Sequence, residues 1–333
     1  MTHPTTCMFP AINLRMKSST SRLPRGAVDQ ELVRDQLNVM AKQDLRQCTR
    51  LCANFACLVR DREQALDMEV ARKRMIDWQF RVVDHYEIPR DAVAASTALL
   101  DRYVSSCHRQ WLECDKSTFK LAAMTTLYMA TKVQDQTRLL SVAKLVELSR
   151  GEFQEVDILR MESRVLVQLG WRVHPVTVHS FIHSFLRFVR NDNALIMAAL
   201  YDRAVFFAEL CLFDQRYATS SRAFLAAAAV LNALEGIGES EACEQAFLDA
   251  LEAQTDIDFR PFPSLEQVRE DLWYIYSLSA QYHEDDQSLS AVSPAPSMTC
   301  DASRDSETKA VIHHHHTHSP TSVHPWAGIG KFA

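Results

Sequence analysis

Apolar positions recur at helical spacing along most of the chain, and short polar stretches separate one run from the next. Asp91 is placed to cap a helix, Gly170 suits a helix end, and Pro89 favours an extended residue before it. Residues 174–177 have the composition of a linker. Before that linker the spacing predicts helices over residues 70–86, 91–106, 117–133, 141–148 and 155–170, after a polar helical stretch over 29–61.

The same pattern repeats after the linker and again predicts a set of about five helices. We therefore expect an all-α protein with two tandem five-helix domains. The predicted helices of the second set cover residues 178–189, 194–212, 221–234, 240–253 and 265–282. The predicted parts are a tail over 1–28, a first domain with its preceding helix over 29–174, a second domain over 175–282 and a tail over 283–333.

Both ends of the chain have the composition of disordered tails. Residues 1–26 contain basic residues and no acidic one, and we favour a tail over a transit peptide there. Beyond Tyr282 the chain is rich in Ser, Pro, Asp and Glu. Ser293 and Ser319 each precede a proline, so both are candidate phosphorylation sites. The run His313–His316 is a tract for which we expect no structural metal site.

Composition excludes several classes of protein. Glycine accounts for only 7 of 333 residues, which favours helices over hairpin-rich sheets or glycine-lined phosphate loops. A net charge of −6 gives no general affinity for nucleic acid or an anionic membrane. The cysteines number 9, an odd count without a C-x-x-C pair, which predicts reduced thiols in an intracellular protein. No segment reaches the roughly 18–20 apolar residues of a membrane span.

Two charged residues lie in line with apolar helical faces. Glu162 is three or four residues from Ile158, Leu159, Val165 and Leu166, so we expect it at the centre of their face. Burying a carboxylate there costs free energy unless it is paired or hydrogen-bonded.

Lys132 raises the same question. It follows Leu121 by eleven residues, about three turns of one helix. Arg72 and Asp101 also flank apolar faces. One interpretation is two internal salt bridges, Arg72 with Asp101 and Lys132 with Glu162. The other is that one pair lies at a surface that a partner protein covers.

Catalysis by these residues is disfavoured, because no nucleophile, histidine base or glycine-rich loop accompanies them. We expect no catalytic residue, no metal and no cofactor. The tripeptide Gly236-Ile237-Gly238 follows a predicted helix and lacks a third glycine, so it does not predict a dinucleotide site.

Four segments of the first helical set carry the charged residues discussed above, each with apolar residues around them. They are ARKRMIDW (71–78), LLDRYVSS (99–106), KLAAMTTLYMATKVQD (120–135) and ILRMESRVLVQLGWRVHPVT (158–177). Together they resemble a cyclin box, over about residues 30–175, and the hallmark positions of the box are occupied by Arg72, Asp101, Leu121, Lys132 and Glu162. The second set, with FIHSF, DRAVFFAELCLFD and SSRAFLAAAAVLNAL, is similar to the C-terminal cyclin fold.

The resemblance implies a non-catalytic subunit, in the nucleus and cytoplasm, that binds and activates a serine/threonine cyclin-dependent kinase in cell-cycle control. It implies that Lys132, Glu162 and Leu121 face the kinase, and that Arg72 and Asp101 form an internal bridge. The Ser/Pro/acidic tail favours a G1-type or D-like cyclin. The alternatives are a transcriptional cyclin, a DNA-binding general initiation factor or a role in nutrient signalling; the net charge of −6 counts against DNA binding.

Many cyclins also have a shallow patch that docks substrates through a basic-x-leucine motif. Here Met75 and Trp78 are suited to such a patch. Arg74 stands where the family has an apolar residue, Arg81 stands where an acid is expected, and Lys120 adds a third cation. Because cations repel a basic motif, we expect this patch not to recruit that substrate class, or to prefer acidic substrates.

Overall fold

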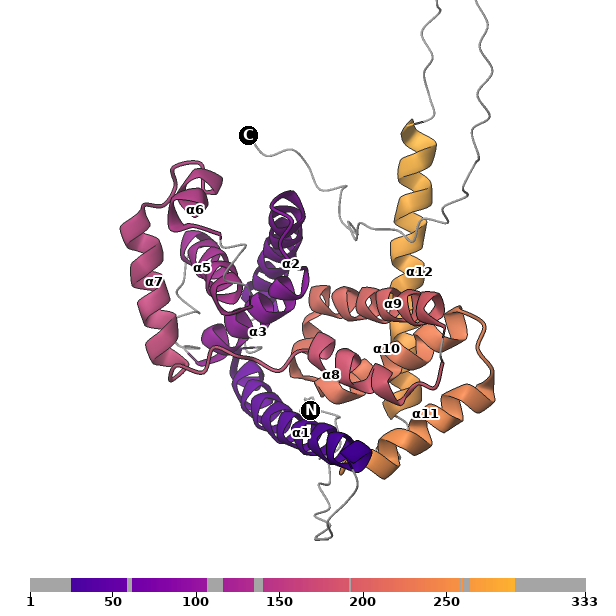
Figure 1. The fold of residues 1–333 in the computed structure, drawn as a ribbon. Helices are drawn as coiled ribbons and strands as arrows, with labels where there is room; N and C mark the ends of the chain where they lie inside the picture. The colour runs from indigo at the N-terminus through magenta and orange to yellow at the C-terminus, as the bar shows by residue number, and fades with distance from the viewer. Residues whose placement is uncertain are drawn as a thin grey trace, which may run out of the picture. The chain divides into compact units, whose positions relative to one another are not determined.

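The computed structural model describes residues 25–58, 62–106, 116–134, 140–191, 193–257, 259 and 264–290. Over these residues all regular structure is helical, which confirms the predicted all-α class (Figure 1). The candidate phosphorylation sites Ser293 and Ser319 and the run His313–His316 lie outside the described residues. A first compact unit ends at Trp273 and contains both helical sets up to that residue; a second unit starts at Tyr274.

The first helical set surrounds one central helix, α3 (Asp91–Ser106). Its small residues, among them Ala94, Ala95 and Ala98, are buried and let neighbouring helices approach closely. It packs against helices of both sets, including α5 and α9. The other helices of the set are α1 (Arg25–Leu58), α2 (Arg62–His85), α5 (Lys116–Gln134), α6 (Val142–Leu148) and α7 (Glu155–Gln168).

The second set repeats this arrangement around α10 (Arg222–Gly236). The segment Ala226–Ala229 of α10 is fully buried, and the helix packs against α8, α9 and α11. Both sets are thus built around an alanine-rich helix that is buried on all sides. The remaining elements are α8 (Val178–Phe185), η1 (Leu186–Phe188), α9 (Ala194–Phe213), η2 (Gln215–Thr219), α11 (Glu241–Gln254) and α12 (Ser264–Ser290).

Helix ends follow the local chemistry of the sequence. Gly170 follows α7 with a φ of 59°, the left-handed conformation expected of a glycine there. Trp171 also has a left-handed φ, 61°, which is a strained conformation for a bulky residue. The predicted helix 178–189 is divided in the structure into α8 and the 3₁₀ turn η1. The predicted C-terminal tail begins at residue 283, and α12 continues to Ser290.

Candidate functional site

Lys132 and Glu162 form an ion pair between the last turn of α5 and the middle of α7. The Lys132 Nζ lies 2.7 Å from Oε1 of Glu162, and 4.7 Å from the centre of the Tyr128 ring. The lysine side chain is 41% exposed and that of the glutamate 13%. Partial burial acts to lower the pKa of Lys132, but the hydrogen bond and charge of Glu162 outweigh it and raise that pKa. Lys132 is therefore a cation at neutral pH, held at the surface.

The prediction that Glu162 occupies the centre of a buried apolar face was wrong. The core-facing residues of α7 are Ile158, Met161 and Val165, whereas Leu159 is 46% exposed. Residues 158, 161 and 165 share one helical stripe, and residue 162 lies at its side, about 40° round the helix axis from residue 158 and about 100° from residue 161. Glu162 therefore lies at the edge of the core, where a partner can reach it.

Exposed apolar side chains also lie along α7 and just after its C-terminal end. Val156 and Leu159 are about half exposed, and Val167 and Trp171 are each 71% exposed. Leu159 shares the side of α7 that carries Glu162, and an exposed apolar side chain beside an ion pair suits a protein-binding surface. Leu121, which the resemblance also assigned to kinase binding, is partly exposed three turns before Lys132 on α5.

Arg72 and Asp101 meet inside the protein. The guanidinium and carboxylate form two hydrogen bonds of 2.8 Å, Nε to Oδ1 and Nη2 to Oδ2. Their side chains are only 7% and 8% exposed. Burial acts to lower the pKa of Arg72, but the charge and hydrogen bonds of Asp101 outweigh burial, so the pKa is raised. In addition, Arg72 Nη1 donates to the carbonyl of Leu212 at 2.6 Å, so this pair also joins the first helical set to α9.

The predicted docking patch on α2 has a different charge balance from the one expected. Met75 is buried, and Trp78 is partly exposed. Arg81 is paired with Asp77 on the same helix, and Lys120 is paired with a carboxylate of the loop before α7, Glu152. Two of the three cations expected to repel a basic motif therefore have an acidic partner beside them.

Sequence reasoning missed a buried carboxylate on α1, Asp44, which is 0% exposed. Its Oδ2 accepts from the backbone N–H of Arg222 at 2.8 Å and from the Ser221 hydroxyl at 3.0 Å. Its Oδ1 accepts from Nη1 of Arg222 at 3.0 Å. Asp44 thus caps α10 from a different helix. The signal was available, since Leu37, Ala41 and Asp44 follow one another at helical spacing.

A second missed pair joins the two helical sets. Arg90, at the start of α3, donates from Nε to Oε1 of Glu209 on α9 at 2.9 Å. The glutamate side chain is 5% exposed. Burial raises the pKa of Glu209 to about 7, although Arg90 acts in the opposite direction.

Two features of other classes of protein are absent from the described residues. No helix there is long and apolar enough to span a bilayer. Those same residues contain no group of three His, Cys, Asp or Glu side chains arranged to hold a metal ion.

Comparison with known proteins agrees with this architecture. The chain matches the family models for the cyclin N-terminal domain over residues 37–174 and the cyclin C-terminal domain over residues 176–287. The fold is similar to the X-ray structure of a viral cyclin from herpesvirus saimiri, with a TM-score of 0.51 at 17% identity, over 63% of this chain and 85% of that one.

Curated relatives are similar at modest identity. Cyclin-D3-2 of Arabidopsis thaliana is 34% identical over 154 residues, which are 42% of this chain and 41% of that protein. The G1/S-specific cyclin-D1 of Xenopus laevis is 25% identical over 218 residues, which are 64% of this chain and 69% of that protein. The match thus extends over less than half of the Arabidopsis relative and about two thirds of the Xenopus one.

Proposed function

Because this chain belongs to the cyclin family, we propose that it binds and activates a serine/threonine cyclin-dependent kinase in the control of the cell cycle. In that complex it is the regulatory subunit and supplies no catalytic group. It acts in the nucleus and cytoplasm and needs no cofactor.

The observation that supports this function is the Lys132–Glu162 pair at the surface, with the exposed Leu159 beside it on α7. An ion pair this exposed contributes only about 0–1 kcal/mol to stability, so its value to the fold is small. The pair can contribute more to the binding of a partner than to the stability of the fold. The ammonium has three N–H donors and the carboxylate two acceptor oxygens, and the 2.7 Å contact between them uses only part of that capacity.

The apolar side chains explain how such a pair becomes useful in a complex. When a partner covers Leu159, which lies on the same side of α7 as Glu162, water leaves the surface around Lys132 and Glu162. Hydrogen bonds from a charged group to backbone are stronger in that dry environment. Trp171 is held in a strained backbone conformation while 71% exposed, which fits a side chain placed for binding rather than for the core.

The proposed action on the kinase follows from these groups. Lys132 donates to carbonyl groups, and Glu162 accepts from N–H groups, near the regulatory helix of the kinase small lobe. Fixing that helix aligns the lysine–glutamate pair of the kinase itself, which phosphoryl transfer requires. A cell-cycle role is favoured over a transcriptional one by the relative that is described as a G1/S-specific cyclin.

The test is affinity capture from native cells with the wild-type chain and a Lys132→Ala/Glu162→Ala variant. We expect the wild type to recover a kinase that phosphorylates serine or threonine, and the variant to recover at least tenfold less. Helical content by circular dichroism should stay the same, because the pair contributes little to folding.

A matched control is Lys144→Ala/Glu147→Ala, which removes an exposed 2.9 Å ion pair from α6. It should capture the kinase as the wild type does. Loss of structure in the Lys132/Glu162 variant, with no kinase recovered by the wild type, would show that this pair is only an internal bridge. Recovery of a transcriptional kinase would contradict the cell-cycle role alone.

The docking patch gives a second experiment. We expect a basic-x-leucine peptide not to bind the wild-type patch, because Arg81 stands beside Trp78 and neutralises Asp77. An Arg81→Glu variant frees Asp77 and adds a second carboxylate, so it should bind the peptide measurably in fluorescence anisotropy. Binding by the wild type that is lost on Trp78→Ala would contradict this account.

A further inference from the structure

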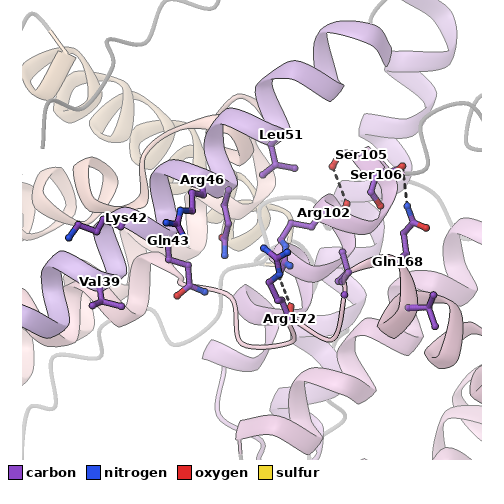
Figure 2. A pocket seen from close by; sticks show the side chains of 14 residues that line it. Val39, Lys42, Gln43, Arg46, Leu51, Arg102, Ser105, Ser106, Gln168 and Arg172 are labelled. Carbon is purple, nitrogen blue, oxygen red and sulfur yellow. Dashed lines mark hydrogen bonds between the residues drawn. The ribbon is translucent and has the colours of Figure 1, made fainter.

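A cleft of about 530 Å³ lies between α1, the C-terminal end of α3 and the segment that follows α7. Figure 2 shows Lys42, Gln43 and Arg46 on α1 along one side, with Arg102 and Arg172 in the middle of the view. The Lys132–Glu162 pair is not among its lining residues. The cleft is therefore a feature separate from that pair.

The described residues that line this cleft include four cations and no carboxylate. Neither Arg46 nor Arg172 forms an ion pair within the described part of the chain, and both side chains are exposed. Such a concentration of positive charge is unexpected in a chain whose net charge is −6. Like charges in one cleft repel each other, and a bound anion relieves that repulsion.

Hydrogen bonds hold the walls of the cleft in place. Arg102 Nη1 donates to the carbonyl of Arg172 at 2.9 Å, which joins α3 to the segment after α7. Gln43 Nε2 donates to the carbonyl of His174 at 3.1 Å, which joins α1 to the same segment. The cleft is thus preorganised, and binding requires little rearrangement.

Gln47 indicates what else the ligand must supply. Its side chain lies on α1 among the lining residues and is 9% exposed. Its Oε1 is buried and has no hydrogen-bond partner, which costs about 1–3 kcal/mol. A ligand that fits this cleft therefore combines an anionic group for the arginines with an N–H or O–H donor for Gln47.

We propose that this cleft binds a phosphorylated serine or threonine of a partner peptide. The phosphate, with close to two negative charges, lies among Arg46, Arg102 and Arg172, whose guanidinium groups bind phosphate oxygens in pairs. A backbone N–H of the same peptide donates to Oε1 of Gln47. A nucleic acid fits less well, because it needs an extended basic surface, whereas this is one small group of cations in a cleft of an acidic chain.

The test is fluorescence anisotropy with the full unphosphorylated chain and a short labelled peptide of alanine and glycine around one phosphoserine. We expect saturable binding of this peptide, at least tenfold weaker binding of the serine form, and displacement by inorganic phosphate. An Arg46→Gln/Arg172→Gln variant should bind the phosphopeptide at least tenfold more weakly. A Gln47→Leu variant should lose peptide affinity but keep its affinity for inorganic phosphate.

The matched control is Arg187→Gln/Arg190→Gln, which removes two exposed arginines that do not line the cleft. It should bind the phosphopeptide as the wild type does, with unchanged circular dichroism. An equal loss in this control would show that only net charge matters and would overturn the proposal. No binding to the wild type, or tighter binding of a single-stranded RNA of the same charge that the Arg46/Arg172 variant loses, would also overturn it.

Discussion

Arg72 makes more contacts than the single pairing with Asp101 that the sequence predicts. Its guanidinium reaches both oxygens of Asp101 and the carbonyl of Leu212. A buried charge held in this way is sensitive to the loss of one partner, since the other charge is left without compensation.

Replacement of Arg72 by alanine should lower the free energy of unfolding by about 3–5 kcal/mol, because Asp101 then remains buried without a counter-charge. Urea unfolding followed by circular dichroism measures this. The Arg72→Lys variant keeps the charge but not the paired hydrogen bonds, so its free energy of unfolding should lie between those of the wild type and the alanine variant. A change below about 1 kcal/mol in the alanine variant would show that water reaches Asp101.

Burial of His179 makes stability depend on pH in the acid range. Neither ring nitrogen has a hydrogen-bond partner, and burial, followed by the charge of Arg90, lowers the pKa of this histidine to about 4. Between about pH 6.5 and pH 4 the unfolded chain binds a proton that the folded chain does not, so stability is lost as pH falls. His179→Leu should remove this loss, seen as a flatter dependence of urea stability on pH. An unchanged slope would contradict it.

Glu209 should change the pH dependence of stability in the direction opposite to that of His179. Burial raises its pKa to about 7, so the folded state favours the protonated carboxyl and this contribution to stability is lost as pH rises from about 4.5 to 7. The Glu209→Gln variant should therefore gain stability relative to the wild type over the same range. If the variant instead loses stability at neutral pH, the ion pair with Arg90 outweighs the cost of burial.

For single residues, the sequence predicted which charged side chains form pairs better than it predicted the other groups that these side chains contact. Arg72 and Asp101 carry opposite charges and flank apolar faces, so their pairing could be anticipated. The Leu212 carbonyl could not, because every residue has a backbone acceptor and nothing in the sequence marks this one. The face of Glu162 was misjudged because two overlapping stripes both fit apolar residues three and four positions apart.

At the scale of helices, α1 has a role that its composition does not suggest. It is a polar helix, yet Asp44 on it is fully buried and caps the N-terminus of α10. Most other helices were placed within a few residues, since each buries an apolar stripe. The role of α1 could not be derived in the same way, because it depends on which distant helix lies beside it.

Asp44→Ala should cost about 3–5 kcal/mol, because it leaves Arg222, which is 6% exposed, without its carboxylate. It should also weaken the attachment of α1, and limited proteolysis should then cleave within α1 at protease concentrations that leave the wild type intact. The Asp44→Asn variant keeps an oxygen acceptor, so it should lose less stability and resist the protease better than the alanine variant. Equal resistance of all three chains would contradict this role.

At the scale of the whole first unit, buried polar contacts cross between the two helical sets. They include Arg72 with the Leu212 carbonyl, Arg90 with Glu209 and Asp44 with Arg222. Polar groups buried in this way lose their partners if one set opens while the other stays folded.

We therefore expect the two sets to unfold in one cooperative transition. Hydrogen exchange measured by mass spectrometry in increasing urea should give amides of α3 and α10 the same opening free energy near the midpoint. Two separate transitions would show that these contacts do not couple the sets.

The position of Asp44 also determines where this chain can be divided. A fragment of the protein that contains only the second helical set has Arg222 but lacks Asp44, the carboxylate that neutralises it. We expect this fragment to be insoluble when it is expressed alone. Co-expression of an N-terminal fragment that includes α1 should rescue it, whereas a fragment that starts after Leu58 should not. The first helix of the chain therefore belongs to both bundles: it packs against α3 of the first set and caps α10 of the second.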